Sequence, residues 1–171
     1  GADAAGHSMG KSIQAVGASY AQASRNIEDG ISYAQMGESV LLEVANLGSR
    51  LRELGIAYDN AALLDANQEA ALDAEAALIG DTVQNIVDTT DFNTVEVVDS
   101  ASATQKAIAF GSLTANTTNV GPNVSITATN TIANAAGSES SADTLLAEVA
   151  KGLGNIAADL TALKAFQGAA S

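Results

Sequence analysis

The sequence predicts a mainly α-helical fold, an elongated bundle of one very long and two medium helices. A small β-hairpin region is expected between the second and third helices, and residues 1–171 are expected to form a single domain. Two observations support this fold class. Apolar residues recur every three or four positions, the spacing of one helix face, over most of the first third of the chain. The chain also contains one Pro, three Tyr, three Phe and no Trp, as expected where long helices exclude Pro and closely spaced helices need few large rings.

The first helix is expected over about residues 4–58. Its apolar positions are Ile13, Val16, Tyr20, Ala23, Ile27, Ile31, Ala34, Val40, Val44, Leu47, Leu51, Leu54 and Tyr58. A helix of about 55 residues would be roughly 80 Å long at 1.5 Å per residue. This exceeds the usual length of helices in globular proteins, so the pattern indicates a rod or coiled-coil element.

Two medium helices are expected further along the chain. A loop at 59–65 contains the turn signal Asp-Asn and precedes a helix at about 66–88. A third helix is expected at about 141–168. The pair Ser140 and Asp143 resembles a capping box at its start, with Asp in place of Glu.

A β region is expected at about 92–133, because the apolar periodicity of helices ends there. β-Branched or alternating segments predict three short strands, at 94–98, 106–111 and 124–132. The polar stretch 113–123 is rich in Thr and Asn and is expected to be a loop or hairpin tip.

Composition excludes several classes of protein. Seven basic and 20 acidic residues give a net charge of −13, which argues against nucleic acid and against anionic membrane surfaces as partners. The chain has no Cys, so disulfides and Cys-based zinc sites are excluded. No apolar run approaches the roughly 20 residues needed to span a bilayer.

The sequence predicts no catalytic, cofactor or metal site, so we do not expect an enzyme. His7 is the only histidine, and a transition-metal site would have to be built from carboxylates alone. The acidic residues are spread over helix faces and are expected to be solvated. Gly6, Gly10, Lys11 and Ser12 resemble the end of a phosphate loop, but the spacing is one residue short and no strand precedes it.

Glycines interrupt the long helix, although each costs about 1 kcal/mol relative to Ala in a helix interior. Several recur seven residues apart and therefore share a face. The expected close-packing positions are Gly10, Gly17, Gly30, Gly37 and Gly48, the last with Gly55 seven residues on. We expect a neighbouring helix to come close to the first helix there, from the same subunit or another one. The alternative is neutral drift in an over-stable rod.

Five stretches resemble the bacterial flagellin family, in the family's order along the chain. They are 3–6 (DAAG), 23–32 (ASRNIEDGIS), 47–54 (LGSRLREL), 88–93 (DTTDFN) and, more loosely, 153–160 (LGNIxxDL). The resemblance implies the filament-core domain of a flagellin, a secreted subunit that packs with other subunits into the extracellular bacterial flagellum for motility.

The resemblance also implies partners. The family's terminal polymerisation segments would lie before Gly1 and after Ser171, so the 171 residues alone are expected to be monomeric. An export chaperone is a further implied partner. Two alternatives remain open: a hook–filament junction protein, which shares these helical motifs, and a cell-surface adhesin or polysaccharide-binding variant of flagellin.

One segment resembles the part of flagellin bound by the animal Toll-like flagellin receptor. The resemblance implies a receptor or subunit contact at Arg50, Arg52, Glu53 and Leu54. Recognised relatives carry an acidic residue on the second helix, where Thr82 is expected to stand here. The alternative is that the leucines of this segment pack the bundle while Arg50, Arg52 and Glu53 contact neighbouring subunits.

Overall fold

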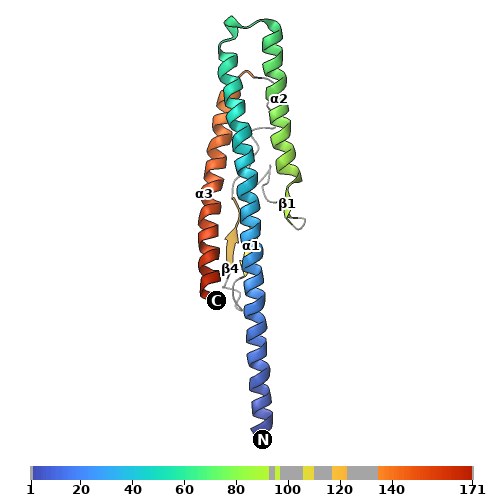
Figure 1. The fold of residues 1–171 in the computed structure, drawn as a ribbon, viewed down its shortest axis with the longest axis vertical. Helices are drawn as coiled ribbons and strands as arrows, with labels where there is room; N and C mark the ends of the chain where they lie inside the picture. The colour runs from blue at the N-terminus through green and yellow to red at the C-terminus, as the bar shows by residue number, and fades with distance from the viewer. Residues whose placement is uncertain (1, 93–94, 97–105, 110–116, 123–134, 171) are drawn as a thin grey trace.

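The computed structural model describes residues 2–92, 95–96, 106–109, 117–122 and 135–170. Figure 1 shows an elongated bundle in which α1 runs almost the full length, with α3 on one side of it and α2 on the other. The helices are α1 (Ala2–Asp59), α2 (Ala66–Thr89) and α3 (Ser138–Ala170), with a short 3-10 helix, η1 (Ala61–Leu63). The expected fold class, a mainly α bundle of one very long and two medium helices, is confirmed.

The α1 helix continues without a break for 58 residues, and its side chains are described from residue 21 onward. One stripe of these side chains is enclosed by the bundle. Its fully buried members include Ile27, Leu41, Val44, Leu51 and Leu54, which follow the three-to-four spacing of a single helix face. Burial of this stripe, rather than helix propensity, stabilises most of the rod.

The chain reverses direction between α1 and α2 through η1. Asp65 ends the reversal as the N-cap of α2 and forms a reciprocal capping box with Gln68. The Gln68 backbone N–H donates to Asp65 Oδ1 at 2.8 Å, and the Asp65 N–H donates to Gln68 Oε1 at 3.0 Å. Two N–H groups that the helix leaves unpaired are thereby satisfied, which fixes the start of α2.

Two small antiparallel pairs of strands follow α2. The first joins β1 (Asp91–Phe92) to β2 (Val95–Glu96), and the second joins β3 (Lys106–Ala109) to β4 (Thr117–Val120). In the second pair Lys106 is opposite Val120. The expectation of a loop throughout 113–123 is wrong at 117–120, where β-branched Thr117 and Thr118 favour a strand. The strand expected at 124–132 lies outside the described residues.

The start of α3 differs from the expected capping box. The helix begins at Ser138, directly after Gly137, whose φ of +73° suits a residue without Cβ. Ser140 is therefore already inside the helix. Asp143, the other member of the expected box, accepts a hydrogen bond from Arg52 instead. The capping-box prediction was wrong because the helix begins at Ser138, before the residue that was expected to cap it.

The core lies between the three helices. The α3 helix contributes Leu145, Val149, Ile156 and Leu163, and α2 contributes Ala76, Ile79, Val83 and Val87. Both sets pack against the buried stripe of α1. Among the described residues, no helix combines the length and apolar character needed to cross a membrane.

Candidate functional site

Arg50 links α1 to α2. Its Nε and Nη2 donate to the two carboxylate oxygens of Glu75 at 2.7 and 3.0 Å, and its Nη1 donates to Glu53 at 3.0 Å. The hydrogen bond to Glu75, and to a smaller extent the one to Glu53, raise the pKa of Arg50. The hydrogen bond from Arg50 lowers the pKa of the Glu75 carboxyl. The planar guanidinium matches the carboxylate geometry, but the cluster is exposed and contributes more to geometry than to stability.

Arg52 links α1 to α3. Its Nε donates to Asp143 at 2.8 Å, and its Nη2 donates to Glu139 at 3.3 Å. Residues two apart on a helix point in nearly opposite directions, about 200° apart. Arg50 and Arg52 therefore reach the two different helices that flank α1, at almost the same level of the bundle.

The expected contact set of Arg50, Arg52, Glu53 and Leu54 divides into two kinds of residue. The two arginines and Glu53 have side chains that are 43–66% exposed, so they lie on the surface while they pair within the chain. Leu54 is 1% exposed and belongs to the core. In this fold Leu54 packs in the core below the exposed segment, so its side chain is not accessible to a partner. The contact role of the other three stays a prediction.

The acidic residue that α2 presents to Arg50 is Glu75, and the expected correspondence of Thr82 to the relatives' acidic residue stays a prediction. Thr82 lies about two turns further along α2, where its hydroxyl donates to the Leu78 carbonyl at 2.7 Å. The α2 helix is antiparallel to α1 after a short reversal, which brings Glu75 rather than Thr82 level with Arg50. Only the three-dimensional path of the reversal fixes this register.

The α3 helix lies close to α1 at Gly48 and Gly55. A Cβ on Gly55 would lie 2.3 Å from the backbone nitrogen of Glu139, and one on Gly48 would lie 3.0 Å from Leu146 Cδ2. Backbone at 2.3 Å cannot move aside, whereas the end of a leucine side chain can. Gly55 is therefore the stricter requirement of the two.

The remaining glycines of the expected set are placed less fully. Gly30 and Gly37 are buried in the bundle. Gly10 and Gly17 lie within α1, but their surroundings fall outside the described side chains. The close-packing role of these four glycines stays a prediction.

A polar contact between α3 and the segment after β4 was not predicted. Asp159 accepts a hydrogen bond from the Gly121 N–H at 2.9 Å, and Asn155 donates to the Pro122 carbonyl at 2.7 Å. Gly121 has a φ of 148°. Burial raises the pKa of Asp159, and the Gly121 bond opposes that change. Asn155 and Asp159 belong to the LGNIxxDL stretch, so the motif was seen but its role was not.

A second carboxylate also holds a turn. Asp73 of α2 accepts a hydrogen bond from the Ala135 N–H at 2.8 Å, just before α3 begins. The sequence interpretation of the acidic residues as solvated faces is therefore too simple for Asp73, Glu75, Asp143 and Asp159. Their partners lie far away in the sequence, so no local pattern could reveal them.

The described side chains contain no group of three or more His, Asp or Glu placed to hold a metal ion. Tyr33 also has a shifted pKa, because burial raises the pKa of its phenol to about 12. A buried phenol of this kind is protonated at neutral pH and belongs to the core cluster.

Comparison with known proteins gives one consistent answer. Residues 1–104 match the model of the bacterial flagellin N-terminal helical region. The chain is 38% identical over 99 residues to a flagellin of Halalkalibacterium halodurans, which covers 58% of this chain and 36% of that protein. It is 37% identical over 82 residues to a B-type flagellin of Pseudomonas aeruginosa, covering 48% of this chain and 17% of that one. The chain thus spans about a third or less of these curated relatives.

A solved structure supports the same fold. A crystal structure of Bacillus cereus flagellin aligns with a TM-score of 0.57 and 19% identity, covering 86% of this chain and 85% of that one. The bundle, with its long rod and inter-helix arginines, defines an elongated helical protein (Figure 1). The family match covers more than half of the sequence, and this chain belongs to the bacterial flagellin family.

Proposed function

We propose that this chain is the core of a structural subunit of the bacterial flagellar filament. Its work is to pack with other flagellin subunits into protofilaments for motility, without catalysis. The match of residues 1–104 to the flagellin helical region carries this proposal. The continuous α1 rod and its flanking helices support it, because side-by-side packing of rods needs long uninterrupted surfaces.

The proposal includes a location outside the cell. Family membership supports a secreted protein that works in the extracellular flagellum and that other flagellin subunits contact. An export chaperone is proposed as a transient partner on the resemblance alone.

The direct test is assembly. Terminal segments from a relative flagellin would be joined before Gly1 and after Ser171, and the product would be inspected by electron microscopy. We expect tubular filaments, while light scattering of the 171 residues alone should show a monomer. A product that folds but never forms filaments, under conditions where the relative does so, would overturn the proposal.

Two alternatives share the same helices. A hook–filament junction protein would join an existing filament end without polymerising, so the assembly test separates it. A polysaccharide-binding or adhesin variant would need aromatic side chains for stacking on sugars. The chain has three Tyr and three Phe, and Tyr33 is buried, which favours the filament subunit.

We also propose the exposed cluster around Arg50 as the site at which an animal Toll-like flagellin receptor would be engaged. Arg50, Glu53 and Glu75 form one exposed charged group, and Leu54 lies beneath it. A receptor reporter assay should lose its signal with Arg50→Ala and keep it with Arg25→Ala, a control on the same helix. Equal signals from both variants would count against recognition here.

A further inference from the structure

Two large apolar side chains stand out on the exposed face of α1. Leu42 is 50% exposed and Ile56 is 41% exposed. They are 14 residues apart, close to four helical turns, so they project from the same face at a separation of about 21 Å. We call these two residues the outer α1 ridge. Neither residue belongs to the buried core cluster formed by the described side chains.

The exposed face of α3 offers gaps with the same spacing. Gly154 and Gly168 are exposed and also 14 residues apart, and a Cβ on either would meet nothing within 4 Å. Neither glycine is therefore explained by crowding within the described chain, although each costs about 1 kcal/mol relative to Ala in a helix interior. This open face differs from Gly48 and Gly55, where α1 and α3 touch.

We infer that the outer α1 ridge of one subunit packs onto the Gly154 and Gly168 positions of a second copy of this chain. The contact joins two different faces, so it is heterologous and can repeat without closing. This inference rests on the proposed filament function and names the surfaces that such a filament would use.

The direction of the contact follows from the fold. The α1 and α3 helices are antiparallel within the chain, so copies that point the same way also bring α1 of one beside an antiparallel α3 of the next. Ile56 then meets Gly154, and Leu42 meets Gly168. Within one chain, Gly55 of α1 lies level with Glu139 of α3, and Gly48 lies level with Leu146. By the same register, Ile56 lies level with position 138 of its own chain, whereas in the contact between copies it meets Gly154, 16 residues further along α3. The second copy is therefore displaced by about 24 Å along the bundle.

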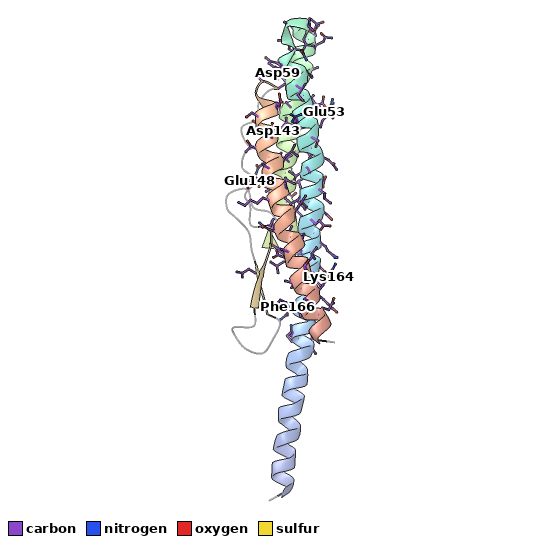
Figure 2. The ribbon with its side chains drawn as sticks, turned by 90° about the vertical axis from the view of Figure 1, so that its left-hand side faces the viewer. Glu53, Asp59, Asp143, Glu148, Lys164 and Phe166 are labelled. Carbon is purple, nitrogen blue, oxygen red and sulfur yellow. The ribbon has the colours of Figure 1, made fainter. Side chains whose placement is uncertain are left out.

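Charge complementarity supports the same direction. Figure 2 shows Glu53 and Asp59 toward the end where α1 turns, and Lys164 toward the opposite end of α3. The displacement brings Lys151 level with Asp59, and Lys164 within one turn of Glu43. Among the side chains that the structure describes, neither lysine forms an ion pair within the chain. The reverse direction would place Lys164 level with Arg52, which is unfavourable.

The test is disulfide cross-linking in the filament, assembled with the terminal segments described above. The chain contains no Cys, so introduced thiols have no competitors. The double variant Ile56→Cys, Gly154→Cys should give a ladder of covalent oligomers on oxidation with copper phenanthroline, and each single variant should not. Within one chain the two positions are about 16 residues out of register, far beyond the reach of a disulfide.

The matched control is Leu78→Cys with Gly154→Cys. Leu78 is another exposed apolar residue, at 65%, but it lies on α2 outside the ridge. We expect several-fold less cross-linking than with Ile56→Cys. Filaments that form normally but cross-link no better with Ile56→Cys than with the control would overturn the inferred contact and leave the filament function standing. If the unaltered protein forms no filaments, the proposed function itself fails.

A bulky residue at Gly154 gives an independent readout. Gly154→Leu has open space around it and removes a helix glycine, so the Tm of the subunit should stay the same or rise. Filament yield should fall several-fold because the gap for Ile56 is filled. Normal filament yield from Gly154→Leu would contradict the inference.

Discussion

The two helices that flank α1 are attached to it in different ways. Along the α3 side, the backbone of α3 lies against α1 at Gly55, and α3 buries Leu145, Ile156 and Leu163 in the shared core. Along the α2 side, the buried residues are smaller, and the contact near the turn is the exposed pair of Arg50 with Glu75. The α1 and α3 helices are therefore the more closely packed pair of the bundle, and α2 is the helix whose position depends more on polar contacts.

Substitution of Gly55 should have the largest effect on this contrast. A Cβ there would lie 2.3 Å from the Glu139 backbone, so Gly55→Ala must push α1 and α3 apart. We expect a loss of about 2 kcal/mol in the free energy of unfolding, because overpacking costs about 1–3 kcal/mol or more. Urea denaturation followed by circular dichroism would measure it.

The control for Gly55→Ala is Gly48→Ala, two turns earlier on the same face. The nearest atom there is the mobile end of Leu146, and the gain in helix propensity of about 1 kcal/mol offsets the crowding. We expect a change near zero. Equal effects of the two substitutions would show that the α1–α3 contact is not fixed at Gly55.

The contact between α3 and the segment after β4 should come next in magnitude. Asp159→Ala leaves the Gly121 N–H without its partner and should cost about 1–2 kcal/mol in unfolding free energy. Asp159→Asn keeps an acceptor oxygen, so it should retain most of the stability near pH 7. Thermal unfolding of the two variants side by side distinguishes the lost acceptor from the lost charge.

The pH dependence of Asp159 has a defined sign. Its pKa is higher in the folded chain than in the unfolded chain, so between the two values the folded state binds more protons. Stability should therefore fall as pH rises through this window, and Asp159→Asn should remove that component. A variant whose acid titration of stability matches the parent would contradict the assignment.

Removing the Arg50 or Arg52 contacts should have the smallest effects on stability. The two substitutions should also affect different helices. Arg52→Ala should cost under about 1 kcal/mol, because both partners are partly exposed. Arg50→Ala should leave global stability nearly unchanged but speed amide exchange at the start of α2. Exchange that rises in α3 instead would reverse the assignment of the two arginines.

Glu75 adds a pH signature to the α1–α2 side. Its pKa is lower in the folded chain than the usual 4.5, so its contribution is present above that value and is lost as pH falls through the folded pKa. Glu75→Gln should abolish this small component without changing the response of α3. Mass spectrometry of amide exchange at pH 6 and pH 4 would detect it.

The helical architecture could be predicted from the sequence because the apolar spacing of a helix is a local pattern. The three-to-four spacing of Ile27, Leu41 and Leu51 follows from one buried face, and that face does not depend on which helix covers it. The Asp65 reversal was also visible, since turn and cap signals lie within a few residues.

What the sequence did not reveal depends on distant partners. Asp143 was assigned to a helix cap because its local pattern fits one, yet Arg52 lies 91 residues away. Glu75 was missed for the same reason, since its register against Arg50 depends on the path of the intervening reversal. Among the glycines, spacing could show a shared face at Gly48 and Gly55 but not which of them touches backbone.

The close approach at Gly55 has a mechanical consequence. It fixes the start of α3 on α1 at one end of the molecule. Further along α3, Asn155 and Asp159 bond to the segment after β4 rather than to α1. Among the described contacts, the backbone approach that resists sliding of α3 along α1 therefore lies at the start of α3. We expect lengthwise sliding of α3 to be smallest near Ser138 and to grow toward Phe166, so site-specific distance distributions should broaden in that direction.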